Sequence, residues 1–176
     1  LETARRGRDA MHDLGQEPGG RVTVGMPPRV AMGLSVPLVR SFRERFPRAV
    51  ITVLEGLSLS LRESLVAGRL DLALMFDPQP SPQLAYETLM REQLLLVAPP
   101  KSRLPPRVAL ASLSSYPLVL PNAPNAIRGL LDEILGPRGV TLNVLAEVGA
   151  VQTVLALVAE GVGCTVLPES ALAARP

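Results

Sequence analysis

The chain has 176 residues, of which 47% are hydrophobic, and its 18 basic and 16 acidic side chains leave a formal charge of +2. This composition excludes a disordered polar segment, because enough apolar side chains are present to form a core. With one cysteine, Cys164, and one histidine, the sequence offers no internal disulfide, no Cys/His zinc site and no histidine-based triad. No run of about 18 apolar residues predicts a membrane span, and we expect no signal peptide at the start.

Hydrophobic periodicity in the first half predicts strands that alternate with helices. The expected order is a helix end at 1–14, a strand at 21–25, a helix at 35–46, a strand at 49–54, a helix at 60–67 and a strand at 70–76. We place the N-cap of the first full helix at Ser35, because Pro37 then lies in the first turn, where proline is tolerated. Ser60 and Glu63 form a capping-box pattern. The apolar run 70–76 is typical of a buried parallel strand.

The second half repeats this alternation after a proline-rich loop. The expected order is a strand at 93–98, a strand at 117–120, a helix at 127–135, a strand at 140–148, a helix at 151–158 and a strand at 162–167. Gly161 is expected to end a helix, and Gly163 to allow a helix and a strand to pack closely. Strands that alternate with single helices predict parallel sheets. Two such runs predict an α/β fold with two Rossmann-like lobes that divide near Ala98 and Pro99.

Catalytic patterns are missing from the sequence. Glu55, Asp77 and Glu147 fall near expected strand ends, but no His, Cys or Ser stands beside them as a nucleophile. Neither a Gly-x-Gly-x-x-Gly pattern nor a P-loop is present, so no nucleotide cofactor is expected. We therefore expect a binding protein rather than an enzyme, with no catalytic residue, no metal and no cofactor. Its ligand should bind in a cleft between the lobes, at the carboxyl ends of the strands, where helix N-termini offer unpaired N–H groups.

Several short segments, taken in order, resemble the effector-binding half of LysR-type transcriptional regulators from about Gly20 to Ala174. The segments are 20–25 (GRVTVG), 37–39 (PLV) with 42–47 (FRERFP), 55–58 (EGLS), 65–74 (LVAGRLDLAL), 92–97 (EQLLLV) and 157–168 (LVAEGVGCTVLP). Each segment is short, but their order and spacing together are specific. The middle and closing segments are most similar to the branch of nitrogen-assimilation control regulators.

The resemblance implies a type 2 periplasmic-binding-protein-like fold. It implies the end of a linker helix and a loop at 1–19, lobe I at 20–98 and a C-terminally incomplete lobe II at 99–176. It also implies a cytoplasmic bacterial regulator that binds a small-molecule effector between its lobes, self-associates as a dimer or tetramer, and controls transcription through oligomer rearrangement. DNA would be contacted only by an upstream winged helix-turn-helix domain, and no membrane is involved. The alternatives are a periplasmic-type solute-binding protein and, more distantly, an enzyme of the deaminase class.

The family's cleft can be transferred to positions of this sequence. The implied effector-binding residues are Pro28, Arg29, Ser58, Phe76, Asp77, Asn122, Glu147, Gly149, Ala150 and Gln152. Arg29 departs from the Ser or Thr of many relatives, and it predicts a small anionic effector that also contacts Ser58. In the alternative, Arg29 fills the pocket or pairs with Asp77 or Glu147 without any ligand. Gly149 and Ala150 also replace polar residues of relatives.

Overall fold

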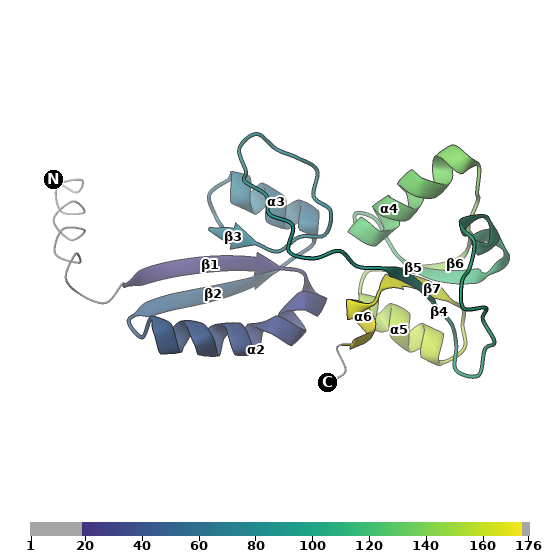
Figure 1. Ribbon diagram of the computed structural model, residues 1–176, viewed down its shortest axis with the longest axis horizontal. Helices are drawn as coiled ribbons and strands as arrows, with labels where there is room; N and C mark the ends of the chain where they lie inside the picture. The colour runs from purple at the N-terminus through teal and green to yellow at the C-terminus, as the bar shows by residue number, and fades with distance from the viewer. Residues whose placement is uncertain (1–18, 174–176) are drawn as a thin grey trace. The chain divides into compact units, whose positions relative to one another are not determined.

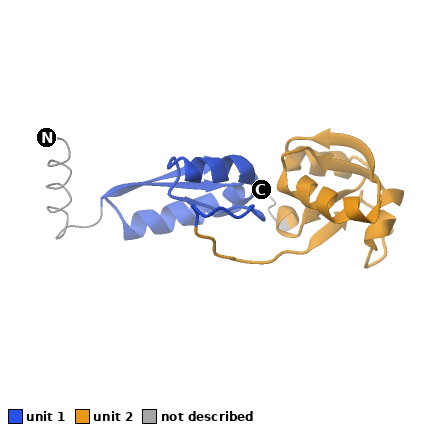
Figure 2. Ribbon diagram, turned by 90° about the horizontal axis from the view of Figure 1, so that it is seen from above, with its two compact units in different colours: residues 1–84 blue, residues 85–176 orange. Residues whose placement is uncertain are grey.

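A computed structural model describes residues 19–173 of the chain, so the helix end expected at 1–14 lies outside the described residues. The chain forms two compact units, residues 1–84 and residues 85–176 (Figure 2). The sequence predicts a division near Ala98 and Pro99, after the strand at 94–97, whereas the two compact units divide before this strand. The reason is that this strand, β4 (Leu94–Val97), pairs with β7 (Thr165–Pro168), which belongs to unit 2.

Unit 1 is built on a three-stranded parallel sheet of order β2-β1-β3 (Figure 1). β1 (Gly20–Met26) and β2 (Ala49–Glu55) pair along their whole length, from Gly20 opposite Ala49 to Met26 opposite Glu55. The alternating, β-branched residues at 21–25 predicted β1 correctly, the strand expected at 49–54 is β2, and the two are parallel as expected. Their full pairing aligns the two carboxyl ends at one edge of the sheet.

The strand expected at 70–76 is far shorter in the structure. Only β3 (Leu72–Ala73) pairs with β1, and the Leu72 side chain is 63% exposed, so the apolar run is not a buried strand. Polar side chains take the backbone hydrogen bonds at both ends of the segment. The Asp71 carboxylate accepts the Thr23 N–H at 2.7 Å, and the Phe76 N–H donates to Ser58 Oγ at 3.0 Å.

The first full helix, α2 (Pro28–Arg45), begins earlier than predicted. Ser35 is not its N-cap, because the Ser35 hydroxyl faces the Met26 sulfur at 4.0 Å from inside the helix. Pro28 occupies the first turn instead, where the missing N–H costs nothing, and Pro37 is tolerated inside the helix at an exposed position. A proline therefore occupies the start of the helix as expected, but it is Pro28 and not Pro37.

The next helix, α3 (Ser58–Val66), also starts earlier than its expected capping box. The Ser60 hydroxyl donates to the Leu57 carbonyl at 2.9 Å inside the first turn, so Ser60 does not cap the helix. The predicted stop is confirmed, because Gly68 follows the helix with a φ of +67°, a conformation that favours glycine.

Unit 2 combines parallel and antiparallel strands. β5 (Pro117–Pro121) and β6 (Asn143–Val148) are parallel as predicted, but β4 and β7 are antiparallel, which corrects the expectation of parallel sheets throughout. An isolated parallel bridge between Leu118 and Cys164 joins the two pairs. β4 departs from the pattern because no helix crosses over before it, and an extended segment leads into it directly.

The two helices that apolar periodicity predicted in unit 2 are confirmed. α4 (Ala126–Leu135) and α5 (Val151–Ala159) lie on opposite faces of the strands (Figure 1). Three short elements were not predicted: 3₁₀ turns at Leu110–Ser115 and Gly136–Arg138, and α6 (Ser170–Ala173). The core contains buried side chains from β5, α4 and β7, including Leu118, Leu120, Ile127, Leu131, Leu135 and Leu167. Within residues 19–173, no helix has both the length and the apolar character needed to cross a membrane.

Candidate functional site

The unit 1 residues expected to bind effector follow three neighbouring strands. Pro28 and Arg29 form the first turn of α2 after β1, and Ser58 is the first residue of α3 after β2. Phe76 and Asp77 come after β3. Because the three strands are parallel and in register, these segments meet at the carboxyl edge of one sheet. We call the five residues the unit 1 edge.

One hydrogen bond joins two members of this edge directly. Ser58 Oγ accepts the Phe76 N–H at 3.0 Å, and both residues are half-buried. The next residue, Asp77, is exposed and has a φ of +38°, in the left-handed region that few residues other than glycine adopt. The chain therefore turns sharply away from the sheet directly after its contact with Ser58.

The residues expected in unit 2 gather at the corresponding edge of β5 and β6. Asn122 follows β5 and donates its backbone N–H to the Val148 carbonyl at 3.2 Å. A Cβ built on Gly149 would lie 3.6 Å from Asn122 Oδ1, so the amide side chain and the glycine are neighbours. Ala150 occupies the N-cap position of α5, and Gln152 lies in the first turn of that helix. We call Asn122, Gly149, Ala150 and Gln152 the unit 2 edge.

Three helix starts at these edges share one electrostatic property. α2, α3 and α5 begin without a side-chain cap and without an acidic residue in the first turn. The first N–H groups of a helix have no partner inside the helix and carry a partial positive charge. Both edges therefore favour negatively charged or strongly accepting groups.

Glu147, the remaining predicted residue of unit 2, lies near the end of β6. Its carboxylate forms an ion pair with Arg128 Nη1 on α4, so it has a cationic partner within its own unit. Arg128 Nε also bonds both oxygens of Asp132, at 2.9 and 3.0 Å. The hydrogen bonds that Arg128 donates to Glu147 and, as the smaller effect, to Asp132 raise the pKa of Arg128. The sequence interpretation missed Arg128, although its i,i+4 spacing from Asp132 is a common sign of a helical ion pair.

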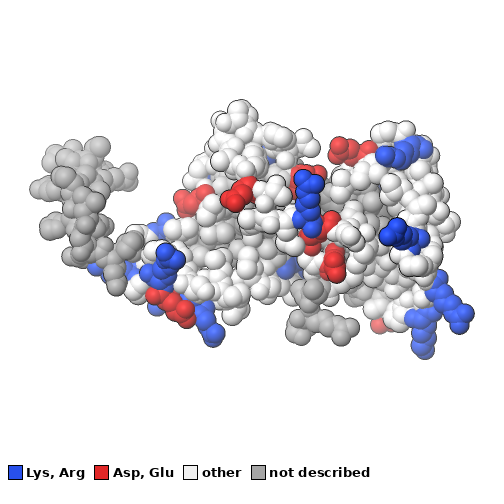
Figure 3. All heavy atoms as spheres, viewed as in Figure 1, with Lys and Arg blue, Asp and Glu red and all other residues white. Residues whose placement is uncertain are grey.

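The distribution of charged and metal-ligating side chains restricts which ligands these edges can bind. In the described part of the chain, no three His, Cys, Asp or Glu side chains are grouped as a metal site would need. On the face drawn in Figure 3, basic and acidic side chains form small separate groups rather than one continuous basic surface. Apart from the Asp77 carboxylate, the edges offer backbone N–H groups, the Ser58 hydroxyl, two side-chain amides and the Arg29 guanidinium, which suit non-covalent recognition of a small polar molecule.

Comparison with known proteins gives a matching family model and similar proteins from several bacteria. A family model described as LysR substrate binding domain matches residues 15–176. The nitrogen assimilation regulatory protein nac of Escherichia coli K12 is 32% identical over 176 residues, which cover 97% of this chain and 56% of that protein. The chain therefore spans about half the length of the curated relatives that it matches.

Solved structures share the fold at lower sequence identity. HinK, a LysR family transcriptional regulator from Pseudomonas aeruginosa, superposes with a TM-score of 0.76 at 23% identity, covering 99% of this chain and 59% of HinK. The effector-binding domain of QuiR in complex with shikimate superposes with a TM-score of 0.75 at 17% identity, covering 86% of this chain and 75% of that one. These likenesses confirm the predicted α/β fold of the type 2 periplasmic-binding-protein kind.

Proposed function

The chain belongs to the family of LysR substrate-binding domains, and we propose that it is the part of a cytoplasmic bacterial transcription regulator that recognises a small-molecule effector. Relatives such as nac are named as regulatory proteins, which favours this reading over a solute-binding protein of a transport system and over an enzyme. We propose that the whole regulator contacts DNA through a segment outside this chain. The cleft expected between the units stays a prediction.

The observation that carries this proposal is the composition of the two edges. Arg29 and the Ser58 hydroxyl lie beside uncapped helix starts at the carboxyl edge of unit 1. Glu147, the carboxylate expected near the unit 2 edge, is already paired with Arg128. Asp77 is the other carboxylate of the predicted set, and it is exposed. The guanidinium of Arg29 and the N–H groups of the helix starts are donors, so we propose that the effector is a small anion that contacts Arg29 and Ser58.

We also propose that the regulator self-associates through α2. This helix has a single buried residue, Ala31, while Val36 on its outer surface is 72% exposed. Met32 and Val39 are also exposed, and their spacing of four and three residues from Val36 places them on the same side of α2. An apolar surface of this kind on two copies can pair with itself, which fits a dimer or a tetramer.

The effector proposal is tested by thermal unfolding of the chain with succinate, benzoate or inorganic phosphate. A ligand that binds only the native state raises stability by RT ln(1 + [L]/Kd), so the midpoint should rise with the concentration of at least one anion. The Arg29→Ala variant should lose this response. The matched control, Arg43→Ala, removes an exposed arginine from the last turn of the same helix and should keep it. Equal responses of the two variants would contradict the role of Arg29.

A further inference from the structure

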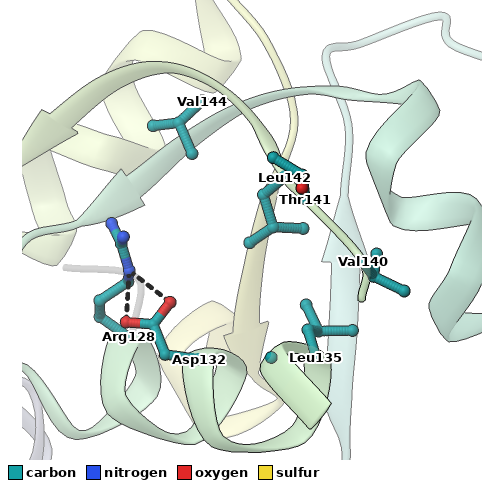
Figure 4. A pocket seen from close by; sticks show the side chains of 8 residues that line it. Arg128, Asp132, Leu135, Val140, Thr141, Leu142 and Val144 are labelled. Atoms are coloured by element: carbon teal, nitrogen blue, oxygen red, sulfur yellow. Dashed lines mark hydrogen bonds and ion pairs between the residues drawn. The ribbon is translucent and has the colours of Figure 1, made fainter. Parts of the chain in front are cut away.

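A hollow of about 330 Å³ opens beside α4 in unit 2 (Figure 4). It lies between α4, the 3₁₀ turn Gly136–Arg138 and the segment that leads into β6. Its lining residues are Arg128, Asp132, Leu135, Gly136, Val140, Thr141, Leu142 and Val144. None of the residues expected to bind the effector lines it, and its volume falls at the lower end of the range for small-molecule sites.

The hollow has an apolar side and a charged side. Figure 4 shows Leu135, Val140 and Leu142 opposite the ion pair of Arg128 and Asp132. Leu135 is 2% exposed and belongs to the core, whereas Val140 and Leu142 are half-buried and keep part of their apolar surface open. A ligand with a short apolar body would remove that surface from water, which favours binding.

The charges on the other side select the head group of such a ligand. One guanidinium, Arg128, stands between two carboxylates, Asp132 and Glu147, so the three groups together carry one net negative charge. The Asp132 side chain is 56% exposed, and each of its oxygens has lone pairs beyond the bond to Arg128 Nε. A ligand carboxylate would be repelled by two carboxylates here, whereas an ammonium group donates to Asp132 and balances the charge.

We propose that this hollow is a second ligand site, which binds a small amphipathic amine. Its ammonium group bonds to Asp132, and its short alkyl chain packs against Leu135, Leu142 and Val144. The site goes beyond the proposed effector function, because it takes a cation where the edges favour an anion. Arg128 bonds both Asp132 in the hollow and Glu147 near the end of β6. A bound amine therefore changes the environment of Glu147 without touching the unit 1 edge.

The probe is isoamylamine, compared with isovalerate, which has the same branched carbon skeleton and a carboxylate head. Isoamylamine should raise the thermal midpoint of the full chain in a saturable way, and isovalerate should not. Asp132→Asn should abolish the response, because the amide removes the negative charge. Val144→Phe should abolish it by filling the hollow. The matched control Glu133→Gln, which removes the neighbouring exposed carboxylate of α4, should respond like the wild type.

A second measurement keeps the proposal falsifiable if the phenylalanine variant fails to fold. In a ¹H–¹⁵N titration of the wild type, isoamylamine should shift the amides of Asp132, Thr141 and Leu142 together with that of Glu147. The proposal is overturned if isovalerate stabilises the chain as much as the amine does, if Asp132→Asn keeps the response, or if these amides do not shift. Such a result leaves the anion response of Arg29 untouched, so failures of the two proposals are distinguishable.

Discussion

The hydroxyl oxygen of Ser58 accepts a hydrogen bond from the backbone N–H of Phe76 at 3.0 Å, which ties the start of α3 to the segment after β3. The two residues are 18 positions apart, and each follows a different strand of the unit 1 sheet. Because Phe76 lies next to the left-handed Asp77, this bond fixes where the chain turns away from the sheet. The shape of the unit 1 edge therefore depends on one serine side chain.

Replacement of that serine should loosen the edge. Ser58→Ala leaves the half-buried Phe76 N–H without its acceptor, and we expect a loss of about 1 kcal/mol in the free energy of unfolding. The exchange of the Phe76 amide hydrogen should also become faster. Ser60→Ala serves as control, because Ser60 bonds only within the first turn of α3 and does not touch the segment after β3. Equal protection of Phe76 in both variants would show that the Ser58 contact does not hold this segment.

Two glycines of unit 2 should respond to alanine in opposite ways. A Cβ on Gly163 would lie 2.8 Å from the backbone oxygen of Pro117 in β5, and backbone cannot move aside as a flexible side chain can. Gly163→Ala should therefore destabilise unit 2 by about 1–3 kcal/mol through overpacking. Gly129 lies inside α4, and a Cβ built on it would meet no other side chain within 4 Å, so Gly129→Ala should stabilise by about 0.5–1 kcal/mol through helix propensity. Denaturant titration of both variants measures the difference, and a stable Gly163→Ala variant would contradict the close approach.

The buried thiol of Cys164 should make stability depend on alkaline pH. Burial raises the pKa of Cys164 because the thiolate is poorly solvated. The native state then holds its proton at a pH where the unfolded thiol, with a pKa of about 8.5, has lost it. The stability contributed by Cys164 is fully present below the unfolded pKa of about 8.5 and is lost as the pH rises from there through the raised pKa of the folded thiol. Above about pH 8.5 the wild type should lose stability more steeply than Cys164→Ala, until the pH passes the raised pKa of the folded thiol, and parallel curves would contradict the prediction.

Self-association through α2 should depend on its exposed apolar surface. Val36→Glu places a charge on that surface, and sedimentation at increasing concentration should then show a larger monomer fraction than the wild type. The proposed role predicts no such change for Ser41→Glu, because Ser41 is exposed five positions after Val36 and therefore lies on a different side of α2. A wild type that stays monomeric at the highest concentrations, or a Val36→Glu variant that associates equally, would show that α2 does not mediate association.

The apolar pattern of the sequence was sufficient to predict the strands β1, β2 and β5 and the helices α4 and α5. β5 is a continuous apolar run that is buried almost throughout, and α4 and α5 each bury a regular apolar face. It failed where a distant polar partner decides the structure. The run 70–76 predicts a strand, but the bonds from the Thr23 N–H to the Asp71 carboxylate and from the Phe76 N–H to Ser58 Oγ cannot be deduced from local spacing.

The candidate site was likewise predictable only where local sequence patterns determine it. The segments of the edges were predictable, since they follow expected strands. The partner of Glu147 was not, because Arg128 lies on another element and only the folded chain brings the two charges together. Helix starts failed for a related reason, since several residues near the start of α2 satisfy the same proline and capping preferences.

The most direct test of the central claim, that the chain senses a small anion at the unit 1 edge, is a ¹H–¹⁵N titration of the labelled chain. Succinate, benzoate and inorganic phosphate are added in turn to the wild type and to Arg29→Ala. The account predicts that at least one anion shifts the amides of Arg29, Ser58, Phe76 and Asp77 in a saturable way, and that the alanine variant loses these shifts. If no anion moves these amides, or if the shifts persist without the Arg29 guanidinium, the claim is contradicted.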